Sequence, residues 1–409
     1  APYVLLSGRT NLAATTLNGS TNATLNTWAP STQDAAAAFT VNSDLLDIQN
    51  VVRFGMAGTV MLNTGSTVID RRGYAQVSLN SRGDIRFLSP DAQASSSAYV
   101  VPDIQAASAL ISQYDLTLGA SRVYPTTGAN ALVIAGLLGR TSLDPTRVVR
   151  FTRTGTTDQA PMSVFGRLDV RAGTIEQGGT LHAPLGRIVL GQVDTTQSVH
   201  FLPGSLTSVS ANGLVIPYGG TTDDLSYLYN GSAISVAGVG GLNGGLSTGV
   251  AQGIAVESKS VVVDQSSVLD LSGGGELTGA AFVSGRGGSV NVLTTPLVNA
   301  NPSHAGSQAG NKVYALLPGY ASAYAPMSPE KGAGDPAVGQ QISVPAGIPG
   351  LAAGTYTLLP SNFALLPGAF RVEIGAGLRR DPGVIALRNG SYAAGGYLGI
   401  ANTAIGAAL

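Results

Sequence analysis

Cysteine is absent from the 409 residues of this chain. Its absence excludes disulfide bonds, thiolate nucleophiles and cysteine-ligated metals. Charge is also scarce, because only 11% of the residues are Asp, Glu, Lys or Arg, against roughly a quarter in an average soluble domain. A compact sphere with so few charges would be poorly soluble. Ser, Thr, Asn and Gln must therefore supply the polar exterior, as they do on stacked β-structures.

Basic residues are few and dispersed, and the formal net charge is -1. No basic stripe with interleaved aromatic residues occurs, so nucleic acid is not expected as a partner. Long apolar runs are missing too. The longest, residues 131–139, is far shorter than the ~20 residues of a membrane-spanning helix. We interpret it as a buried strand.

What the chain does contain is short β-rich runs between Gly, Asn, Asp and Pro, as in residues 166–191 and 259–275. Each run has hydrophobic residues two apart within a stretch of three to five residues, and a turn signal follows. Helical periodicity is scarce. The best helical candidate is residues 104–113, which follow Pro102 and Asp103.

The strands also recur at a longer spacing. Leu168 and Ile188 are 20 residues apart, and Val268 and Val290 are 22 apart. A period near 20 is typical of a coil in which each turn contributes two or three short strands. The sequence thus predicts an all-β chain with a right-handed parallel β-helix over most of residues 1–295. Eight side chains are expected to point inward and be buried: Ile175, Leu181, Ile188, Leu190, Val268, Leu271, Val290 and Val292.

Composition changes near residue 295, where Pro-, Ala- and Gly-rich stretches begin. We expect residues 1–295 to form a β-helical shaft. Residues 296–409 are expected to form loops and short strands that pack on the coil or continue it. Two LLPG phrases, at 316–319 and 365–368, predict strand ends followed by turns, because Pro blocks further pairing and Gly permits the bend.

Parallel β-helices also host enzymes that act on polysaccharides, and such sites need converging acidic groups. The candidates are Asp223 and Asp224, with Tyr227 and Tyr229 as a weak carbohydrate-contact platform. A solvated turn between coils is the simpler interpretation of this segment. The residue types therefore predict no catalytic residue and no cofactor.

A metal site is not expected either. His182 and His200 lie 18 residues apart, about one coil, and could be neighbours in space. No third ligand with suitable spacing accompanies them, so surface or stacked histidines are the favoured interpretation.

Several phrases resemble the filamentous haemagglutinins, very large proteins that Gram-negative bacteria secrete through two-partner systems. They are LTLGASRVYPTTGANALVIAG (116–136), GRLDVRAGTIEQGGTLHAPLGRIVLG (166–191), PGSLTSVSANGLVIPYGG (203–220), VLDLSGGGELTGAAFVSGRGGSVNVL (268–293), KVYALLPGY (312–320), GLAAGTYTLLPSNFALLPGAFRV (350–372) and NGSYAAGGYLGIANTAI (389–405). Together they cover most of residues 40–405.

This resemblance implies a right-handed β-helical exoprotein on the bacterial surface or in the medium, acting in adhesion, aggregation or biofilm formation. An outer-membrane β-barrel transporter would export it, through a secretion domain that is not visible in this chain. Surface glycans or proteins would be its partners, with self-association as a further option. We expect a non-enzymatic shaft segment; a polysaccharide-acting enzyme and the shaft of a contact-dependent toxin-delivery protein are the alternatives.

Overall fold

A computed structural model describes residues 1–8, 37–54, 58–61, 68–71, 74–90, 107–137, 142–222, 226–229, 232–233, 252–279, 285, 288–300, 306–327, 335–375, 383–402 and 406–408. Within these ranges nearly every regular element is a strand. The helical elements are α1 (Leu297–Ala300) and the 3-10 helix η2 (Ser361–Leu365). The expected all-β class is confirmed for the described part of the chain.

The chain divides into two compact units. The first unit consists of Ala1, Tyr3–Asn212 and Val250–Gly274. The second unit consists of Pro2, Gly213–Gly249 and Gly275–Leu409. The change in composition near residue 295 therefore lies inside the second unit.

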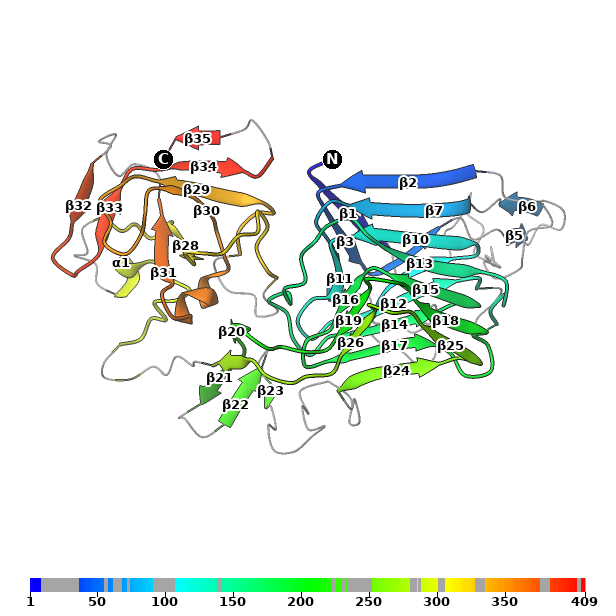
Figure 1. Ribbon diagram of the computed structural model, residues 1–409. Coiled ribbons are helices and arrows are strands. Elements are labelled where there is room, and N and C mark those ends of the chain that lie inside the picture. Colours follow the sequence, from blue (N-terminus) through cyan, green and yellow to red (C-terminus); the bar gives the residue numbers. More distant parts are fainter. Residues whose placement is uncertain are drawn as a thin grey trace. The chain divides into compact units, whose positions relative to one another are not determined.

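Three parallel sheets make up the first unit (Figure 1). The first sheet holds, in spatial order, β1 (Tyr3–Ser7), β3 (Leu45–Gln49), β8 (Asp84–Phe87), β11 (Arg122–Pro125), β16 (Thr180–His182), β19 (Leu206–Ser208) and β26 (Val268–Asp270). The second sheet holds β2 (Ala37–Ser43), β7 (Tyr74–Ser81), β10 (Asp115–Ala120), β13 (Val148–Arg153), β15 (Thr174–Gly178), β18 (Ser198–Phe201) and β25 (Ser260–Val263). The third sheet holds β4 (Val51–Phe54), β9 (Ala107–Ser112), β12 (Asn130–Ala135), β14 (Arg167–Arg171), β17 (Arg187–Gly191) and β24 (Gly253–Glu257). All neighbouring strands in these sheets run parallel.

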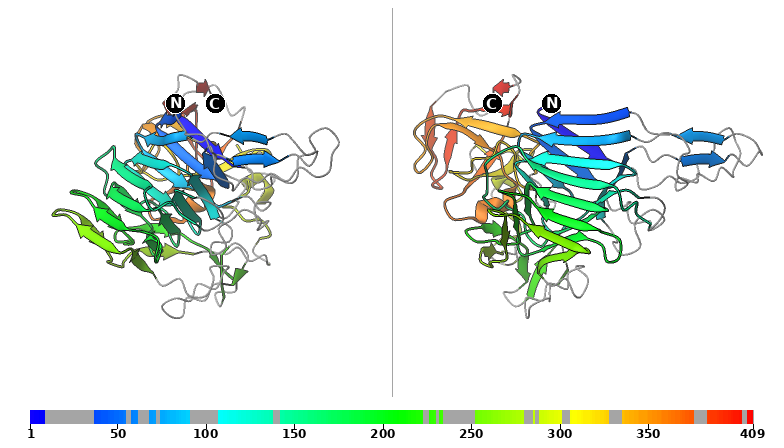
Figure 2. Two further views of the ribbon diagram at one scale, coloured as in Figure 1. Left: turned by 90° about the vertical axis from the view of Figure 1, so that its right-hand side faces the viewer. Right: turned by 45° about the vertical axis from the view of Figure 1, so that its right-hand side comes forward.

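The chain visits the three sheets in rotation, first the second sheet, then the first, then the third. We call one such passage a coil; β2–β3–β4, β7–β8–β9 and β10–β11–β12 are complete coils. Strands of successive coils lie stacked beside one another (Figure 2). The coil of β13 and β14 has no strand in the first sheet, and β11 pairs instead with β16 through Val123 and Leu181. One antiparallel hairpin, β5 (Gly58–Met61) with β6 (Val68–Arg71), lies between β4 and β7 in the sequence.

One apolar core is built from the inner faces of all three sheets. Along the second sheet Val77, Leu116, Val149, Ile175 and Val199 are adjacent in register, and none has exposed surface. Residues of the first and third sheets belong to the same buried cluster. Successive side chains of a strand point to opposite faces, so every second residue enters this core. Each inward side chain of an internal strand is covered by the coils before and after its own, whereas a terminal strand has such a neighbour on one side only.

Half of the expected inward residues are confirmed. Ile175, Leu181, Ile188 and Leu190 are fully buried. The prediction is wrong for the other four: Val268, Leu271 and Val292 are exposed, and Val290 is half-buried. Val268 pairs with Leu206 and faces outward with it, because the inward column of this sheet runs through Leu181, Thr207 and Leu269. Leu271 directly follows the last strand of the sheet. Val290 and Val292 belong to the second unit and lie outside its strands.

The coil period is less regular than the sequence indicates. Leu168 and Ile188 do pair, as the 20-residue spacing predicts. Ile188, however, next pairs with Ile254, which is 66 positions later (254 − 188). Val268 and Val290 do not pair, because Val268 lies at the edge of its sheet. Residues inserted at the corners lengthen a coil without shifting its strands, and the entropic cost of a longer loop grows slowly with length.

The expected helix at residues 104–113 is wrong, because its described part contains strand β9. This strand is buried on both faces. Leu110 enters the main core, whereas Ile111 belongs to a second apolar cluster on the outer face of the third sheet, together with Leu132 and Leu143. A strand with two buried faces lacks the alternating pattern that would identify it. The neighbouring run at 131–139 contains β12, a buried strand as predicted.

Close packing of coils depends on glycine at the corner before β17. A Cβ atom on Gly186 would overlap the backbone of Gly166 in the preceding coil, where Arg187 donates its N–H to the Gly166 carbonyl (3.0 Å). We expect Gly186→Ala to lower the free energy of unfolding by about 3 kcal/mol through overpacking.

Gly204 provides the matched control for this substitution. It has a φ of 75°, but nothing lies within 4 Å of the position that a Cβ atom would occupy, so Gly204→Ala should cost only about 1 kcal/mol of backbone strain. Chemical denaturation followed by circular dichroism compares the two variants. Equal losses would contradict the packing explanation.

The second unit combines short sheets, mostly antiparallel. Its strands are β20 (Val215–Pro217) and β27 (Glu276–Thr278), a parallel pair; β21 (Gly220–Thr222), β22 (Ser226–Tyr229) and β23 (Ser232–Ala233); β28 (Lys312–Leu316) and β31 (Phe370–Ile374); β30 (Gly354–Thr357), β29 (Gln340–Val344), β34 (Tyr397–Ile400) and β35 (Gly406–Ala408); and β32 (Val384–Ala386) with β33 (Tyr392–Ala394). Its buried cluster consists of Tyr314, Leu316, Ile342, Leu351 and Leu358. This unit thus has an apolar core of its own.

Candidate functional site

Of the four residues singled out as carbohydrate contacts, the two tyrosines lie on a small antiparallel sheet of the second unit. Asp223 and Asp224 fall outside the described residues, between β21 and β22 in the sequence. Tyr227 and Tyr229 lie on β22, opposite Thr221 of β21 and Ser232 of β23 respectively. The structure thus places the backbone of the two tyrosines, and carbohydrate binding by this segment stays a prediction.

The two histidines that could have been neighbours lie on different sheets. His182 is on β16 of the first sheet, and His200 is on β18 of the second. His200 contacts Asp264 of the next coil, with 2.9 Å between Nε2 and the carboxylate. The third histidine, His304, lies outside the described residues. In the described ranges no cluster of three or more His, Cys, Asp or Glu side chains could hold a metal ion.

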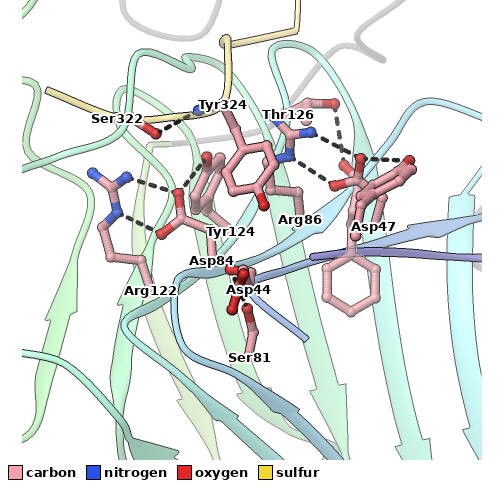
Figure 3. A network of polar contacts seen from close by, with 12 residues as sticks. Asp44, Asp47, Ser81, Asp84, Arg86, Arg122, Tyr124, Thr126, Ser322 and Tyr324 are labelled. Carbon is pink, nitrogen blue, oxygen red and sulfur yellow. Dashed lines mark hydrogen bonds and ion pairs between the residues drawn. The ribbon is translucent and has the colours of Figure 1, made fainter. Parts of the chain in front are cut away.

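The first sheet instead carries a row of buried polar side chains on its outer face. Asp47 of β3 and Arg86 of β8 are adjacent in register and form a two-pronged ion pair, with Nε–Oδ1 and Nη2–Oδ2 distances of 2.7 and 2.8 Å (Figure 3). Both side chains are almost completely buried. Tyr3 of β1 donates a third hydrogen bond to the Asp47 carboxylate (3.1 Å). Three coils thus meet at one carboxylate.

A second ion pair lies one coil further along. Arg122 of β11 donates to both oxygens of Asp84 on β8, at 2.9 and 2.7 Å, and Tyr124 donates to the same carboxylate (Figure 3). Strand β8 therefore contributes Arg86 to the coil before it and Asp84 to the coil after it. Arg82, just before β8, pairs in turn with Asp44 but is itself largely exposed. The row ties consecutive coils together by charge.

These contacts shift the pKa values of the groups involved. Burial opposes the charge of Arg86, but the charge and hydrogen bonds of Asp47 outweigh it and raise the pKa of Arg86 above its ordinary value. Burial, followed by the charge of Asp47, raises the pKa of Tyr3. Both groups therefore keep their ordinary protonation state across the physiological pH range.

His182 occupies the same outer row of the first sheet, beyond Tyr124. His182 is in register with Ser208 of the next coil, and Ser208 is in register with Asp270 of the coil after that. The ring is 1% exposed, and neither ring nitrogen has a hydrogen-bond partner among the described residues. Burial, and next the charge of Arg122, lower the pKa of His182 to about 4. The imidazole is therefore neutral at physiological pH.

A partly buried carboxylate organises part of the second unit. Glu373 on β31 accepts hydrogen bonds from the backbone N–H of Leu297 (3.0 Å), from Ser307 Oγ (2.5 Å) and from Asn311 Nδ2 (2.7 Å). Burial alone would raise the pKa of Glu373, but these bonds and the charge of Arg371 lower it. The carboxylate fixes the segments around α1 and residues 306–311 to β31.

The arrangement of the polar row is suited to holding coils together. In both ion pairs the arginine is matched by an aspartate at bonding distance, so the charges neutralise each other. These residues were not predicted from the sequence, although a signal existed: DIRF of β8 and LLDIQ of β3 place charged residues inside otherwise apolar strands. Buried charges of this kind require partners. Which strands supply the partners depends on the coil register.

Comparison of the chain with models of protein families, with curated proteins and with solved structures finds no match. Among the described residues no helix has the length and apolar character needed to cross a membrane. The resemblance to filamentous haemagglutinins rests on the quoted phrases alone.

Proposed function

We propose that this chain is a structural and adhesive segment of a long bacterial surface or secreted fibre, and that its first unit is a right-handed parallel β-helix. The observation that carries the proposal is the rotation of the chain through three parallel sheets around one apolar core. Strand connections in parallel sheets are right-handed in about 98% of cases, which supports the handedness.

A stack of this kind suits a fibre because each coil needs only its neighbours for stability. Seven strands in one sheet have six intervals of about 4.8 Å, so the first unit extends roughly 29 Å along the stack. Further coils of the same design would lengthen it without a change in architecture. The buried ion pairs between consecutive coils support a mechanical role, because they resist the sliding of one coil past another.

The outer face of the second sheet supports a role in adhesion. A column of hydroxyl side chains, Thr40, Ser78 and Thr117, runs across β2, β7 and β10 in register. Asn42 and Asn80 form a parallel column, joined by a hydrogen bond of 3.3 Å. This hydroxyl-rich part of the face, which continues in register into the Arg150–Glu176 ion pair, can exchange hydrogen bonds with surface glycans or with another protein.

The adhesive role is tested with microspheres that carry the purified full chain. Microspheres with folded chain should be retained on bacterial and epithelial cell layers several-fold more than microspheres with chain unfolded in denaturant before coupling. Equal retention would remove the adhesive proposal.

The same preparation tests the enzymatic alternative. We expect incubation with a panel of acidic polysaccharides to release no new reducing ends. Release that disappears in Asp223→Ala would replace the fibre proposal with the enzyme.

A further inference from the structure

The last coil of the first unit has a free edge in all three sheets. Counted here from the third sheet, it consists of β24, β25 and β26, and each is the terminal strand of its sheet (Figure 1). One edge of each strand is paired, with β17, β18 and β19 respectively. Among the described residues no strand pairs with the opposite edges. A row of free strand edges is a template for the addition of further strands.

The inward side chains of this coil are aliphatic, yet they are exposed. Val261, Val263 and Leu269 are 48%, 56% and 37% exposed. Their register partners one coil earlier, Val199, Phe201 and Thr207, are 0–1% exposed. The outward side chains Val262 and Val268, together with Leu271 just after β26, extend the exposed apolar surface. A continuous aliphatic patch of this kind marks an interaction surface.

Some backbone N–H groups of the last coil also point toward the free edge. Ser260 donates its N–H to the carbonyl of Gln197, just before β18, and Asp264 donates to the carbonyl of Phe201, the last residue of β18. Because N–H groups alternate in direction along a strand, those of Val261 and Val263 point toward the free edge. The same alternation applies to β26. Val268 donates its N–H to the carbonyl of Ser205, so the N–H of Leu269 points toward the free edge. A further layer of strands would cover the exposed aliphatic side chains and accept hydrogen bonds from these N–H groups.

We propose that the last coil is a self-association surface, on which a second copy of this chain docks its own last coil, tail to tail. The earlier coils of the first unit establish the type of contact, because each is covered by another coil with aliphatic side chains facing it. A two-fold arrangement places the same surface on both copies and is the commonest in soluble oligomers.

The charges at the ends of β25 favour this orientation. Lys259 precedes the strand, and Asp264 follows it. Two copies of β25 related by a two-fold axis pair antiparallel, so the Lys259 end of one lies beside the Asp264 end of the other. The three valines between them, Val261 to Val263, face the same three valines. The strand is thus complementary to itself in charge and in shape.

This surface does not depend on the proposed fibre function, because it is built only from residues 252–271 and the coil beneath them. A negative result in the adhesion assay would not contradict self-association, and a monomeric chain would not contradict the adhesive proposal.

Light scattering coupled to size-exclusion chromatography tests the proposal on the full chain. We expect the mass to rise with concentration, from 41.2 kDa toward twice that value, between about 1 and 100 µM. The double variant Val261→Lys with Val263→Lys should remain at the mass of one chain, because it places four positive charges across the two-fold axis. Val193→Lys is the matched control: it is 62% exposed in a turn of the same unit and should associate as the unchanged chain does.

A second variant separates association from folding. Val261→Pro removes only an N–H that points to the free edge, and proline is tolerated at such a position. It should retain the circular dichroism spectrum and thermal midpoint of the unchanged chain, and remain monomeric. The proposal is overturned if the unchanged chain has the mass of one copy at every concentration, or if the lysine and proline variants associate as strongly as Val193→Lys.

Discussion

Replacement of Arg86 by alanine is expected to lower the free energy of unfolding by about 3–5 kcal/mol. The substitution leaves the Asp47 carboxylate buried, 1% exposed, with the neutral Tyr3 hydroxyl still donating to it from another coil. An uncompensated charge in a low-dielectric interior has a large desolvation cost, which a well-matched guanidinium otherwise offsets. Urea denaturation at neutral pH, followed by circular dichroism, measures the loss.

Arg82 supplies the matched control, since it pairs with Asp44 next to the same strand but has an 84% exposed side chain. Exposed ion pairs contribute about 0–1 kcal/mol, so Arg82→Ala should be nearly neutral. The double variant Asp47→Leu with Arg86→Met removes both charges and should recover much of the stability lost in Arg86→Ala. A double variant as unstable as Arg86→Ala would indicate that shape, and not charge, dominates at this position.

The alternating pattern of the strands was sufficient to predict the all-β class and part of the core. Ile175 lies between Thr174 and Glu176, Ile188 follows Arg187, and both isoleucines are fully buried. The first LLPG phrase also behaves as predicted, because β28 ends at Leu316 and Gly319 has a φ of 88°. In the second phrase Leu365 ends a 3-10 helix and not a strand. Local turn chemistry identifies the bend but not the element before it.

The coil period could not be predicted, because it depends on the lengths of the connections at the corners. The 209–252 segment separates β19 from β24 without altering the register of the sheets. A pattern in sequence shows which residues point inward, but only the stack shows which of them are covered. Leu269 faces inward in register with the fully buried Thr207, yet it is 37% exposed because its strand is the last of its sheet.

The polar row could be predicted only in part, for a related reason. A charged residue inside an apolar strand indicates a buried ion pair, and Asp84 and Arg86 in DIRF meet this description. Their partners Arg122 and Asp47 are 38 and 39 residues away in the sequence. No local sequence rule predicts these separations in sequence. They follow from the stacking of β3, β8 and β11.

Acidification from pH 6.5 to pH 4 is expected to destabilise the first unit through His182. The pKa of this group is 6.5 in the unfolded chain and about 4 in the folded one. Between these values the unfolded chain binds more protons than the folded chain, so stability is fully present above pH 6.5 and falls as the pH falls. At 1.36 kcal/mol per pKa unit, the shift corresponds to about 3 kcal/mol at pH 4.

The comparison of His182→Phe with the unchanged chain isolates this effect. Phenylalanine keeps an aromatic ring at the position and cannot take up a proton, so its stability should be nearly constant between pH 6.5 and about 4.5. Carboxylates with lowered pKa values that do not interact with His182, such as Asp144 and Glu373, also lose stabilising contacts in acid, but they do so equally in both proteins. The quantity to measure is therefore the difference in unfolding free energy between the two proteins at each pH.

His200→Phe is the control for histidine content, because His200 lies at the partly exposed contact with Asp264. It should retain the acid sensitivity of the unchanged chain. The difference between His182→Phe and the unchanged chain should grow by about 3 kcal/mol as the pH falls from 6.5 to 4. A difference that stays constant with pH would mean that His182 gains a partner for its proton in the folded state, and that the buried row accommodates a positive charge there.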